Sequence, residues 1–332
     1  MKRIAIIGAG SWGTALAIVA ARASHEVTLW SRNLDVVNSI NERRFNPFYL
    51  TAVEIPGTVV CASEIDAVVN HAEHVLFAAP SHAARELFTT IAPHLNELAV
   101  VVSVAKGIEI ETGKRISEIF KEVGGNTNPF VCLSGPSFAR EVVAGHPTAI
   151  VAASKDAAAA RAVQNDLSFE NLRIYTNADV IGTEIGGSVK NVMAIAAGMA
   201  TGLGFGANSV AALITRGLAE ITRLARREGA QVETLMGLAG LGDLVLTCTG
   251  TLSRNRFVGE QLGKGKRLEE IATELNEVAE GINTARAVKK LADSASLEMP
   301  IVNEVNAVLY EGKSAREAVS NLMSRPLREE LS

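Results

Sequence analysis

The sequence is poor in cysteine and aromatic residues, and it has no excess of positive charge. Its 332 residues include only 3 Cys and 2 Trp, and the formal net charge at pH 7 is −4. Cys61, Cys132 and Cys248 lie far apart and lack the Cys-x-x-Cys or histidine spacing of a metal site. We therefore expect buried thiols and a reducing compartment. The charge balance excludes a global basic field that would attract nucleic acid or an anionic membrane.

Segments that direct a chain to a membrane or a secretory route are also lacking. Met1-Lys2-Arg3 leads into Ile4–Ile7 and then directly into glycines, which leaves no room for the apolar core and cleavage site of a signal peptide. The uncharged stretch Val192–Ile214 is long enough to span a bilayer, but glycines interrupt it between 202 and 206. We expect a cytoplasmic protein without membrane contact, in which this stretch packs inside the fold.

The histidines show no spacing typical of metal ligands. His71, His74, His82 and His94 lie in or beside stretches with helical periodicity, and none belongs to an H-E-x-x-H motif. We interpret them as surface or capping residues and predict no metal. His25 directly precedes a predicted strand and is expected to be structural.

The first half of the chain alternates short apolar runs with helical stretches. The length of the whole chain, 332 residues, favours two domains. Up to about Thr176 the alternation is typical of βαβ units and a mainly parallel sheet. The predicted strands are Arg3–Ile7, Val27–Trp30, Thr58–Cys61, Val75–Ala78, Ala99–Ser103, Phe130–Leu133, Ala149–Ala152 and Leu172–Tyr175. Between them we predict helical stretches such as Trp12–Ala23, Ala83–Ile91, Lys114–Val123 and Ala157–Asp166.

Beyond about Asn177 the β-rich runs vanish, and segments rich in Ala, Leu, Glu, Lys and Arg follow with helical spacing. The predicted helices here are Gly182–Met199, Ser209–Arg227, Leu268–Leu275, Ile282–Leu291 and Val302–Tyr310. We predict an α/β protein with a parallel-sheet domain over 1–177 and an all-helical substrate domain over 178–332. Because no Pro/Gly-rich linker separates them, the domains should pack tightly with the active site between them.

A glycine motif, Gly8-Ala9-Gly10-Ser11-Trp12-Gly13, follows the first predicted strand and opens the first predicted helix. In a G-x-G-x-x-G of this context, Gly8 permits the tight turn, Gly10 lets the backbone approach a pyrophosphate, and Gly13 lets helix and strand pack closely. The pyrophosphate would bind the N–H groups at the positive end of the helix. This predicts a Rossmann-type dinucleotide-binding domain; the alternative is a glycine-rich turn without a ligand.

The end of the second predicted strand bears on the choice of dinucleotide. NAD-specific enzymes usually place Asp or Glu there to bind the ribose 2′-hydroxyl, whereas this chain has Trp30-Ser31-Arg32. A guanidinium can pair with a 2′-phosphate through charge-assisted bonds. We therefore predict that both NADP and NAD are used and that NADP is preferred. The alternative is that Arg32 is a solvated surface residue.

Two lysines stand in otherwise apolar surroundings. Carbonyl reduction by a nicotinamide needs a proton donor beside the developing alkoxide. Lys106 follows an apolar strand at the edge of the sheet where ligands bind in such folds, and Lys190 lies on a helix rich in Ile, Val, Ala and Gly. Burial and a neighbouring lysine would lower the pKa of Lys190 toward useful acid/base chemistry. The alternative is a lysine whose ammonium reaches water.

Two further polar groups stand out in the second half. Asp243 is a lone acid in the apolar run 240–249, and Lys190 is its natural partner. Ser253-Arg254-Asn255-Arg256 could clamp a phosphate or carboxylate. Taken alone, that segment could equally be a solvated turn.

Together and in this order, these segments closely resemble the bacterial NAD(P)-dependent sn-glycerol-3-phosphate dehydrogenase family, over essentially the whole chain. The segments that carry the resemblance are Gly8–Gly13, Ser103–Ile108, Leu133–Ala139, Glu184–Asn191, Gly240–Thr249, Ser253–Asn255 and Val278–Gly281.

The resemblance implies a role for each matching residue. Contacts to the dinucleotide would come from Ser11, Trp12, Arg32, Lys106, Ala139, Arg254, Val278 and Glu280. Contacts to dihydroxyacetone phosphate or glycerol 3-phosphate would come from Lys106, Gly135, Ser137, Lys190, Asp243, Ser253, Arg254 and Asn255. Lys190 would be the general acid/base, with Asp243 and Lys106 as the other catalytic residues. The product would feed glycerophospholipid synthesis. We further expect a homodimer formed through the helical half, because twofold homo-oligomers are the most frequent.

Two other functions remain compatible with the residues alone. A related dehydrogenase of a small 2- or 3-hydroxy acid could use Arg254 to bind a carboxylate. A non-catalytic NADP(H) sensor could bind a partner protein through the helical half, although it would have no need of an interior Lys190 and Asp243.

Overall fold

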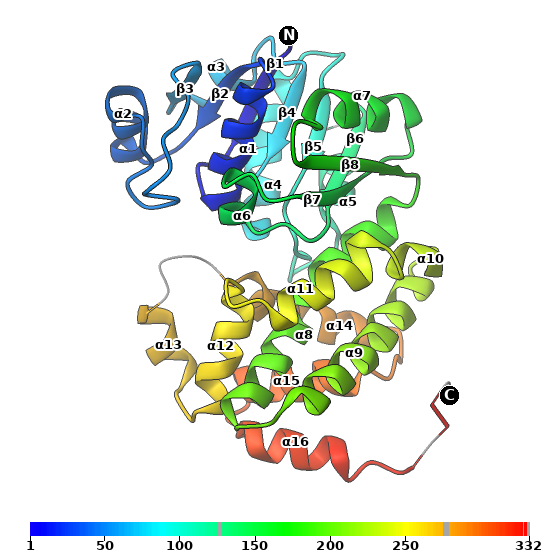
Figure 1. Ribbon diagram of the computed structural model, residues 1–332. Coiled ribbons are helices and arrows are strands. Elements are labelled where there is room, and N and C mark those ends of the chain that lie inside the picture. Colours follow the sequence, from blue (N-terminus) through cyan, green and yellow to red (C-terminus); the bar gives the residue numbers. More distant parts are fainter. Residues whose placement is uncertain (125–127, 275–278, 328, 331–332) are drawn as a thin grey trace.

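In the computed structural model the described residues, 1–124, 128–274, 279–327 and 329–330, form a sheet-containing half and a helical half (Figure 1). The sheet has eight strands in the order β3-β2-β1-β4-β5-β6-β7-β8. All neighbouring strands are parallel except β6 and β7, which confirms the predicted mainly parallel sheet. The strands are β1 Arg3–Ile7, β2 Glu26–Trp30, β3 Val59–Ala62, β4 His74–Phe77, β5 Val100–Ser103, β6 Phe130–Ser134, β7 Thr148–Ala153 and β8 Leu172–Asn177.

Helices cover both faces of this sheet, which explains why its central strands are apolar without alternation. In β1, Ile4 and Ile6 pack into one apolar cluster, and Ala5 and Ile7 pack into another on the opposite face. The helical segments of this half are α1 Ser11–Arg22, α2 Leu34–Arg43, α3 Ile65–Val69, η1 Ser81–Ala83, α4 Ala84–Ile91, η2 Ala92–His94, α5 Ile116–Val123, α6 Ala139–Val143 and α7 Ala157–Leu167.

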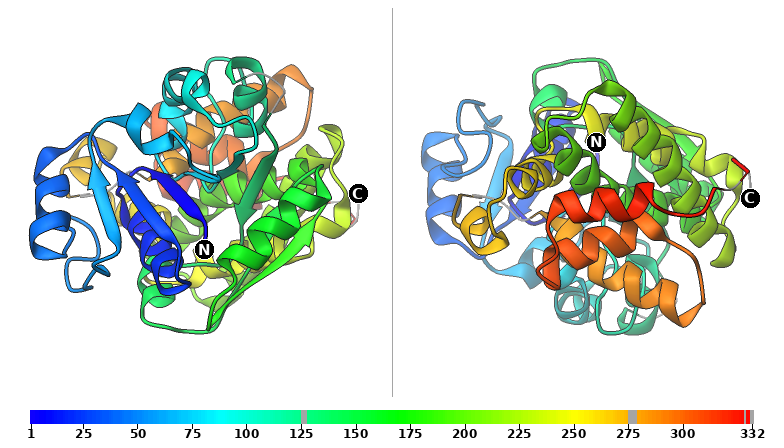
Figure 2. Two further views of the ribbon diagram at one scale, coloured as in Figure 1. Left: turned by 90° about the horizontal axis from the view of Figure 1, so that it is seen from above. Right: turned by 90° about the horizontal axis from the view of Figure 1, so that it is seen from below.

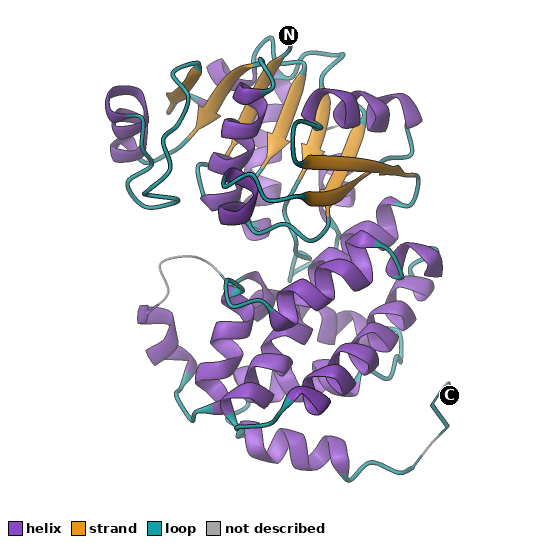
Figure 3. Ribbon diagram, in the orientation of Figure 1, coloured by secondary structure: helices purple, strands orange, loops and turns teal. Residues whose placement is uncertain are grey.

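The carboxyl ends of the central parallel strands face the helical half (Figure 3). Strand β1 lies between β2 and β4, so the chain order reverses beside it. Ligands of open α/β sheets bind at such a switch point, beyond the carboxyl ends of the strands. The topology therefore directs the segments that follow β1, β4, β5 and β6 toward the helices.

The helical half is built around α8, Val180–Gly202, whose residues from Gly182 to Ala200 are all buried. Because Gly259 meets Ile195 with no room for a Cβ, α12 crosses α8 at very close range. The other helical segments are α9 Ala207–Arg227, α10 Val232–Leu235, the π-helix η3 Leu238–Gly242, α11 Asp243–Thr249, α12 Arg254–Gly263, α13 Leu268–Glu274, α14 Glu280–Ser294, α15 Pro300–Tyr310 and α16 Ala315–Met323. Helix α16 lies at the end farthest from the sheet (Figure 1), so it is in front when the molecule is seen from below (Figure 2, right).

The prediction that His74 is a surface or capping residue is wrong. His74 is the first residue of β4, is 3% exposed, and its Nε2 lies 2.6 Å from Oδ2 of Asp166 on α7. Asp166, near the end of α7, supplies a partner for the buried ring. His71, His82 and His94 are exposed. His25 is buried and accepts a hydrogen bond from the Lys2 backbone, as expected of a structural residue.

The stretch 192–214 is divided between α8 and α9, and its α8 part is buried up to Ala200. Within the described ranges, a different window, Val232–Thr249, is long and apolar enough by composition to cross a membrane, with mean hydropathy 1.3. It is folded as α10, η3 and α11, and 44% of it is buried.

The three cysteines are free and buried, as predicted, and burial raises the pKa of Cys61 and Cys248 to about 12.

Candidate active site

The glycine turn between β1 and α1 is shaped to receive an anion. Gly8 has φ +115°, and a Cβ on Gly13 would lie 1.9 Å from the Gly8 carbonyl oxygen, so both positions require glycine. Gly10 is the N-cap of α1, no side chain caps that end, and a Cβ on Gly10 would meet nothing within 4 Å. The start of α1 therefore has open space beside Gly10, and the N-terminus of a helix is a place where a phosphate can bind. Ser11 and Trp12, which begin the helix, are half-buried.

Arg32 lies beyond the end of β2, at the same sheet edge as the glycine turn, because β2 pairs with β1 in parallel. Its side chain is exposed. The preceding residues are held in place, since Trp30 Nε1 donates to the Ser63 carbonyl at 2.8 Å and Ser31 N donates to the Ala62 carbonyl at 3.0 Å. A guanidinium in this position is accessible to a ligand group that lies beyond the strand.

Lys190, Asp243 and Lys106 meet where the two halves of the chain face each other. Lys190 Nζ lies 2.6 Å from Asp243 Oδ1, which is the pair that the sequence predicted. Lys106 Nζ lies 2.6 Å from the other carboxylate oxygen and donates to the Gly135 carbonyl at 3.1 Å. Asp243 is 1% exposed and Lys190 is 6% exposed, whereas the Lys106 side chain is 17% exposed. One buried carboxylate thus holds an ammonium from each half of the protein.

Small residues bring the elements of this group together. A Cβ on Gly186 would lie 2.7 Å from the Ala239 carbonyl of η3, and one on Gly187 would lie 2.6 Å from Ser134 Oγ at the end of β6. These glycines let α8 approach both the sheet edge and the π-helix, and Lys190 follows them by one turn. The π-helix ends where α11 begins, at Asp243. Single-turn π-helical segments of this kind are frequent at functional sites.

The pKa of Lys190 is lowered to about 8. Burial is the main cause, because removing an ammonium from water disfavours its charged form, and the charge of Lys106 acts in the same direction. Asp243 opposes both effects through its charge and its hydrogen bond. Thr247 Oγ, one helical turn after Asp243, accepts a second hydrogen bond from Lys190 Nζ at 2.7 Å. Lys190 therefore titrates in a range where it can both give and take a proton.

A chain of amide hydrogen bonds connects this group to α12 and α14. Asn191 Nδ2 donates to the Lys106 carbonyl at 3.3 Å, and Asn255 Nδ2 donates to Asn191 Oδ1 at 3.0 Å. Asn255 Oδ1 in turn accepts from Gly281 N at 2.9 Å. Its neighbour Glu280 accepts from Ser81 N, after β4, at 2.9 Å. The structure thus brings Asn255 and Glu280 into the network that contains Lys106.

The remaining residues implied by the resemblance lie around this network. Ser137 Oγ donates to the Gly135 carbonyl at 3.0 Å, and Ala139 begins α6. Ser253 is the N-cap of α12, with its Oγ accepting from Arg256 N at 3.2 Å, and Arg254 is the exposed first residue of that helix. The segment 253–256 is therefore a helix N-terminus rather than a solvated turn. Val278 lies outside the described residues.

Sequence reasoning missed Thr247 and Asn191 as members of the site. Thr247 follows Asp243 by four residues, which is one turn of a helix, and Asn191 is adjacent to Lys190. The spacing of Thr247 and the position of Asn191 indicate membership of the site only once α11 and α8 are known to be helices that face it.

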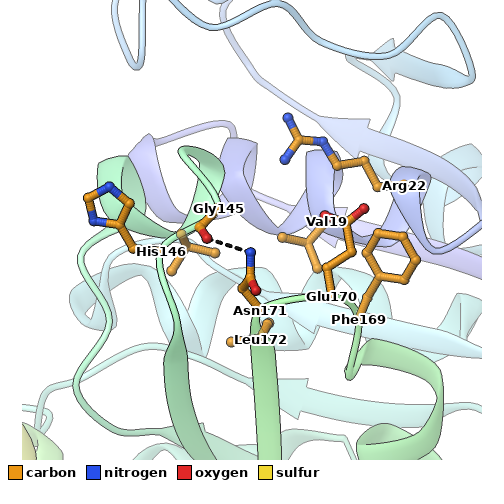
Figure 4. Close-up of a pocket in the computed structure, with 9 residues that line it drawn as sticks. Val19, Arg22, Gly145, His146, Phe169, Glu170, Asn171 and Leu172 are labelled. Atoms are coloured by element: carbon orange, nitrogen blue, oxygen red, sulfur yellow. Dashed lines mark hydrogen bonds between the residues drawn. The ribbon is translucent and has the colours of Figure 1, made fainter.

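The pocket in Figure 4 lies away from this group, at the far end of α1 from the glycine turn, and has a volume of about 20 Å³. That is room for about one water molecule, so the pocket is not a substrate site. Its lining residues are Val19, Arg22, Val142, Gly145, His146, Phe169, Glu170, Asn171 and Leu172.

Within the described part of the chain, His, Cys, Asp and Glu form no group of three or more that could hold a metal ion.

Comparisons with known proteins agree with this geometry. Residues 3–160 match the family description "NAD-dependent glycerol-3-phosphate dehydrogenase N-terminus", and residues 179–320 match the corresponding C-terminus. The glycerol-3-phosphate dehydrogenase [NAD(P)+] of Koribacter versatilis is 52% identical over 330 residues, which cover 98% of this chain and 98% of the relative. That of Citrifermentans bemidjiense is 47% identical over 331 residues, which cover 99% of each chain.

A solved structure supports the same assignment. The crystal structure of glycerol-3-phosphate dehydrogenase from Coxiella burnetii matches with a TM-score of 0.94 and 39% identity, covering 98% of this chain and 99% of that one. The chain belongs to the NAD-dependent glycerol-3-phosphate dehydrogenase family.

Proposed function

We propose that the protein transfers a hydride between NAD(P)H and C2 of dihydroxyacetone phosphate to give sn-glycerol 3-phosphate, with Lys190 exchanging the proton. The observation that supports this role is the buried Lys190 ammonium, held between Asp243 and Thr247 beside Lys106. When bound, the reduced nicotinamide supplies the hydride. Lys190 gives the C2 oxygen its proton, and Asp243 orients the ammonium and keeps it charged until that transfer.

The residues around Lys190 account for recognition of a phosphorylated substrate. Arg254 projects from the first turn of α12, where its guanidinium and the helix N-terminus both favour an anion. Lys106 adds positive charge, while Gly135, Ser137, Ser253 and Asn255 offer backbone and side-chain polar groups nearby. A phosphate bound at Arg254 would place the carbonyl end of a three-carbon substrate toward Lys190.

The glycine turn fits a dinucleotide, because its helix end has no side-chain cap and opens onto free space at Gly10. Gly8, Gly10, Ser11, Trp12 and Gly13 would hold the pyrophosphate, with further contacts from Lys106, Ala139, Arg254, Val278 and Glu280. Both NAD and NADP serve this family. We assign the preference for NADP to the exposed Arg32, which can pair with a 2′-phosphate.

Dinucleotide binding and catalysis are assigned to different halves of the chain. We assign residues 1–177 to dinucleotide binding and 178–332 to substrate binding and catalysis, since the sheet ends at Asn177 and α8 begins at Val180. The product is the building block of glycerophospholipids, which suggests a biosynthetic role. A cytoplasmic location is supported by the buried free cysteines, and a homodimer through the helical half by the frequency of twofold assemblies.

A substrate panel tests the proposal. Dihydroxyacetone phosphate, unphosphorylated dihydroxyacetone and small 2- or 3-keto acids are each offered with NADPH. We expect kcat/KM to be at least about 100-fold higher for dihydroxyacetone phosphate, because the unphosphorylated ketone cannot form the charge-assisted hydrogen bonds of a phosphate with Arg254. A keto acid as the best substrate would favour a hydroxy-acid dehydrogenase. NADPH binding without turnover of any compound would favour the sensor.

A further inference from the structure

Asn46, in the connection between α2 and β3, is buried against the glycine turn. Its side chain is 1% exposed, although the connection is otherwise largely at the surface. The amide Nδ2 donates to the Ala9 carbonyl at 2.9 Å and to Thr14 Oγ at 3.0 Å. The amide oxygen accepts from Phe48 N and Tyr49 N, both at 3.1 Å. Both N–H groups and both acceptor sites of the amide are thus in use.

The Ala9 carbonyl stands outside the hydrogen-bond ladder of α1. The ladder begins one residue later, where Thr14 N donates to the Gly10 carbonyl at 2.9 Å. The Ala9 carbonyl instead receives side-chain donors, Asn46 Nδ2 at 2.9 Å and Thr14 Oγ at 3.4 Å. A buried carbonyl without such partners would cost free energy, so these donors stabilise the inward orientation.

The orientation of this carbonyl determines where Gly10 N–H points. The Ala9 carbonyl and the Gly10 N–H belong to one planar, trans peptide group, so they point in opposite directions. With the carbonyl held inward by Asn46, the Gly10 N–H points away from Asn46, and a Cβ on Gly10 would meet nothing within 4 Å. Glycines on both sides of Ala9 make this peptide group easy to rotate when nothing holds it.

We propose that Asn46 is a positioning residue for dinucleotide binding: its amide fixes the Ala9–Gly10 peptide group so that the N–H is aimed at the pyrophosphate. The proposal rests on the proposed function, because it assumes that the glycine turn binds NAD(P). Asn46 faces the protein side of the turn and acts on the ligand only through the backbone.

The test compares Asn46→Ala with Asn41→Ala. Asn41, on α2, is a matched control because its amide also holds backbone, that of β3, donating to the Cys61 carbonyl at 2.8 Å and accepting from Cys61 N at 2.9 Å, but no hydrogen bond joins it to the glycine turn. We expect Asn46→Ala to raise the Kd of NADPH, measured by fluorescence titration, and its KM about tenfold. The KM of dihydroxyacetone phosphate and kcat at saturating NADPH should stay within about twofold, and Asn41→Ala should bind NADPH like the wild type.

A second pair of variants keeps the proposal testable if Asn46→Ala does not fold. Thr14→Val keeps the side-chain shape but removes the hydroxyl that bonds both Asn46 and Ala9, and we expect it to weaken NADPH binding about threefold. Thr14→Ser retains the hydroxyl and should restore the affinity. Wild-type affinity in Asn46→Ala, or in Thr14→Val where the former is unfolded, would overturn the proposal. Wild-type protein that does not bind NADPH would instead overturn the proposed function.

Discussion

Lys190 and Asp243 form a buried ion pair with 2.6 Å between Nζ and Oδ1. The residues are 53 positions apart, on α8 and at the start of α11. The second oxygen of the same carboxylate holds Lys106, which comes from the sheet half. Asp243 thus fixes the proposed acid of the reaction relative to the edge of the sheet where we propose that the dinucleotide binds.

Replacing Lys190 by Ala should abolish most of the turnover. A positioned general acid contributes about 10²- to 10⁴-fold to the rate, so kcat for reduction of dihydroxyacetone phosphate should fall by that factor. The Kd of NADPH should change little, since the proposed mechanism gives Lys190 a contact with the substrate rather than with the dinucleotide. Stopped-flow measurement of kcat and fluorescence titration of NADPH check both statements. Near-normal turnover in this variant would remove Lys190 from the mechanism.

The pH profile should report the lowered pKa of Lys190. In the proposed mechanism the ammonium is the proton donor for ketone reduction, and burial lowers its pKa to about 8. Reduction should therefore slow as the pH rises through about 8, whereas oxidation of glycerol 3-phosphate should accelerate over the same range. Asp243→Asn should move both transitions to lower pH, because Asp243 raises the pKa of Lys190. Profiles that are flat between pH 7 and 9.5 would contradict this assignment.

Arg32→Glu should reverse the preference between the two dinucleotides. A carboxylate repels the 2′-phosphate of NADPH but can bind the ribose 2′-hydroxyl of NADH. We expect kcat/KM for NADPH to fall about tenfold or more relative to that for NADH. Arg43→Glu, at an exposed position in the last turn of α2, makes the same charge change and is the control. An equal change in both variants would indicate a general field effect rather than contact with the phosphate.

Glu184 should be important for stability, because it joins the two halves of the chain. On α8, it accepts from Arg115 Nη1 at 2.7 Å and from Ser117 N at 2.7 Å, before and within the first turn of α5. Burial raises the pKa of Glu184, while Arg115 and Ser117 oppose that rise. Arg115→Met leaves this buried carboxylate with its hydrogen bonds from Ser117 but without a counter-charge, which should lower the free energy of unfolding by about 3 kcal/mol.

Urea unfolding measures that change. Lys289→Ala breaks the exposed pair with Asp293 and should cost less than about 1 kcal/mol. If the two variants were equally stable, the Arg115–Glu184 pair would not tie α8 to the sheet half.

The sequence predicted the elements whose hydrophobic pattern is strong. All the predicted strands are present within a residue or two, because strands buried on both faces are continuous apolar runs. Helices α2 and α12 are among those not named from the sequence, since their polar, short sequences lack a clear apolar stripe, although α12 lies in the half that was predicted to be all-helical. Helix α13 ends at Glu274, and the Leu275 of its prediction lies outside the described residues.

The site could be predicted where a polar residue interrupts an apolar run. Lys190 and Asp243 were paired on that basis, because an isolated buried charge requires a partner. The pair Arg115–Glu184 and the contact of His74 with Asp166 were not predicted. Each joins residues that only the tertiary fold brings together, and no local pattern indicates the partner.

The most direct test of the function follows the absorbance of NADPH, and separately of NADH, after addition of dihydroxyacetone phosphate to the purified protein. We predict rapid oxidation that depends on the substrate, faster with NADPH, and formation of one sn-glycerol 3-phosphate for each dinucleotide oxidised. No oxidation of either dinucleotide, by protein shown to bind NADPH, would contradict the assignment of Lys190 and its neighbours to this reaction.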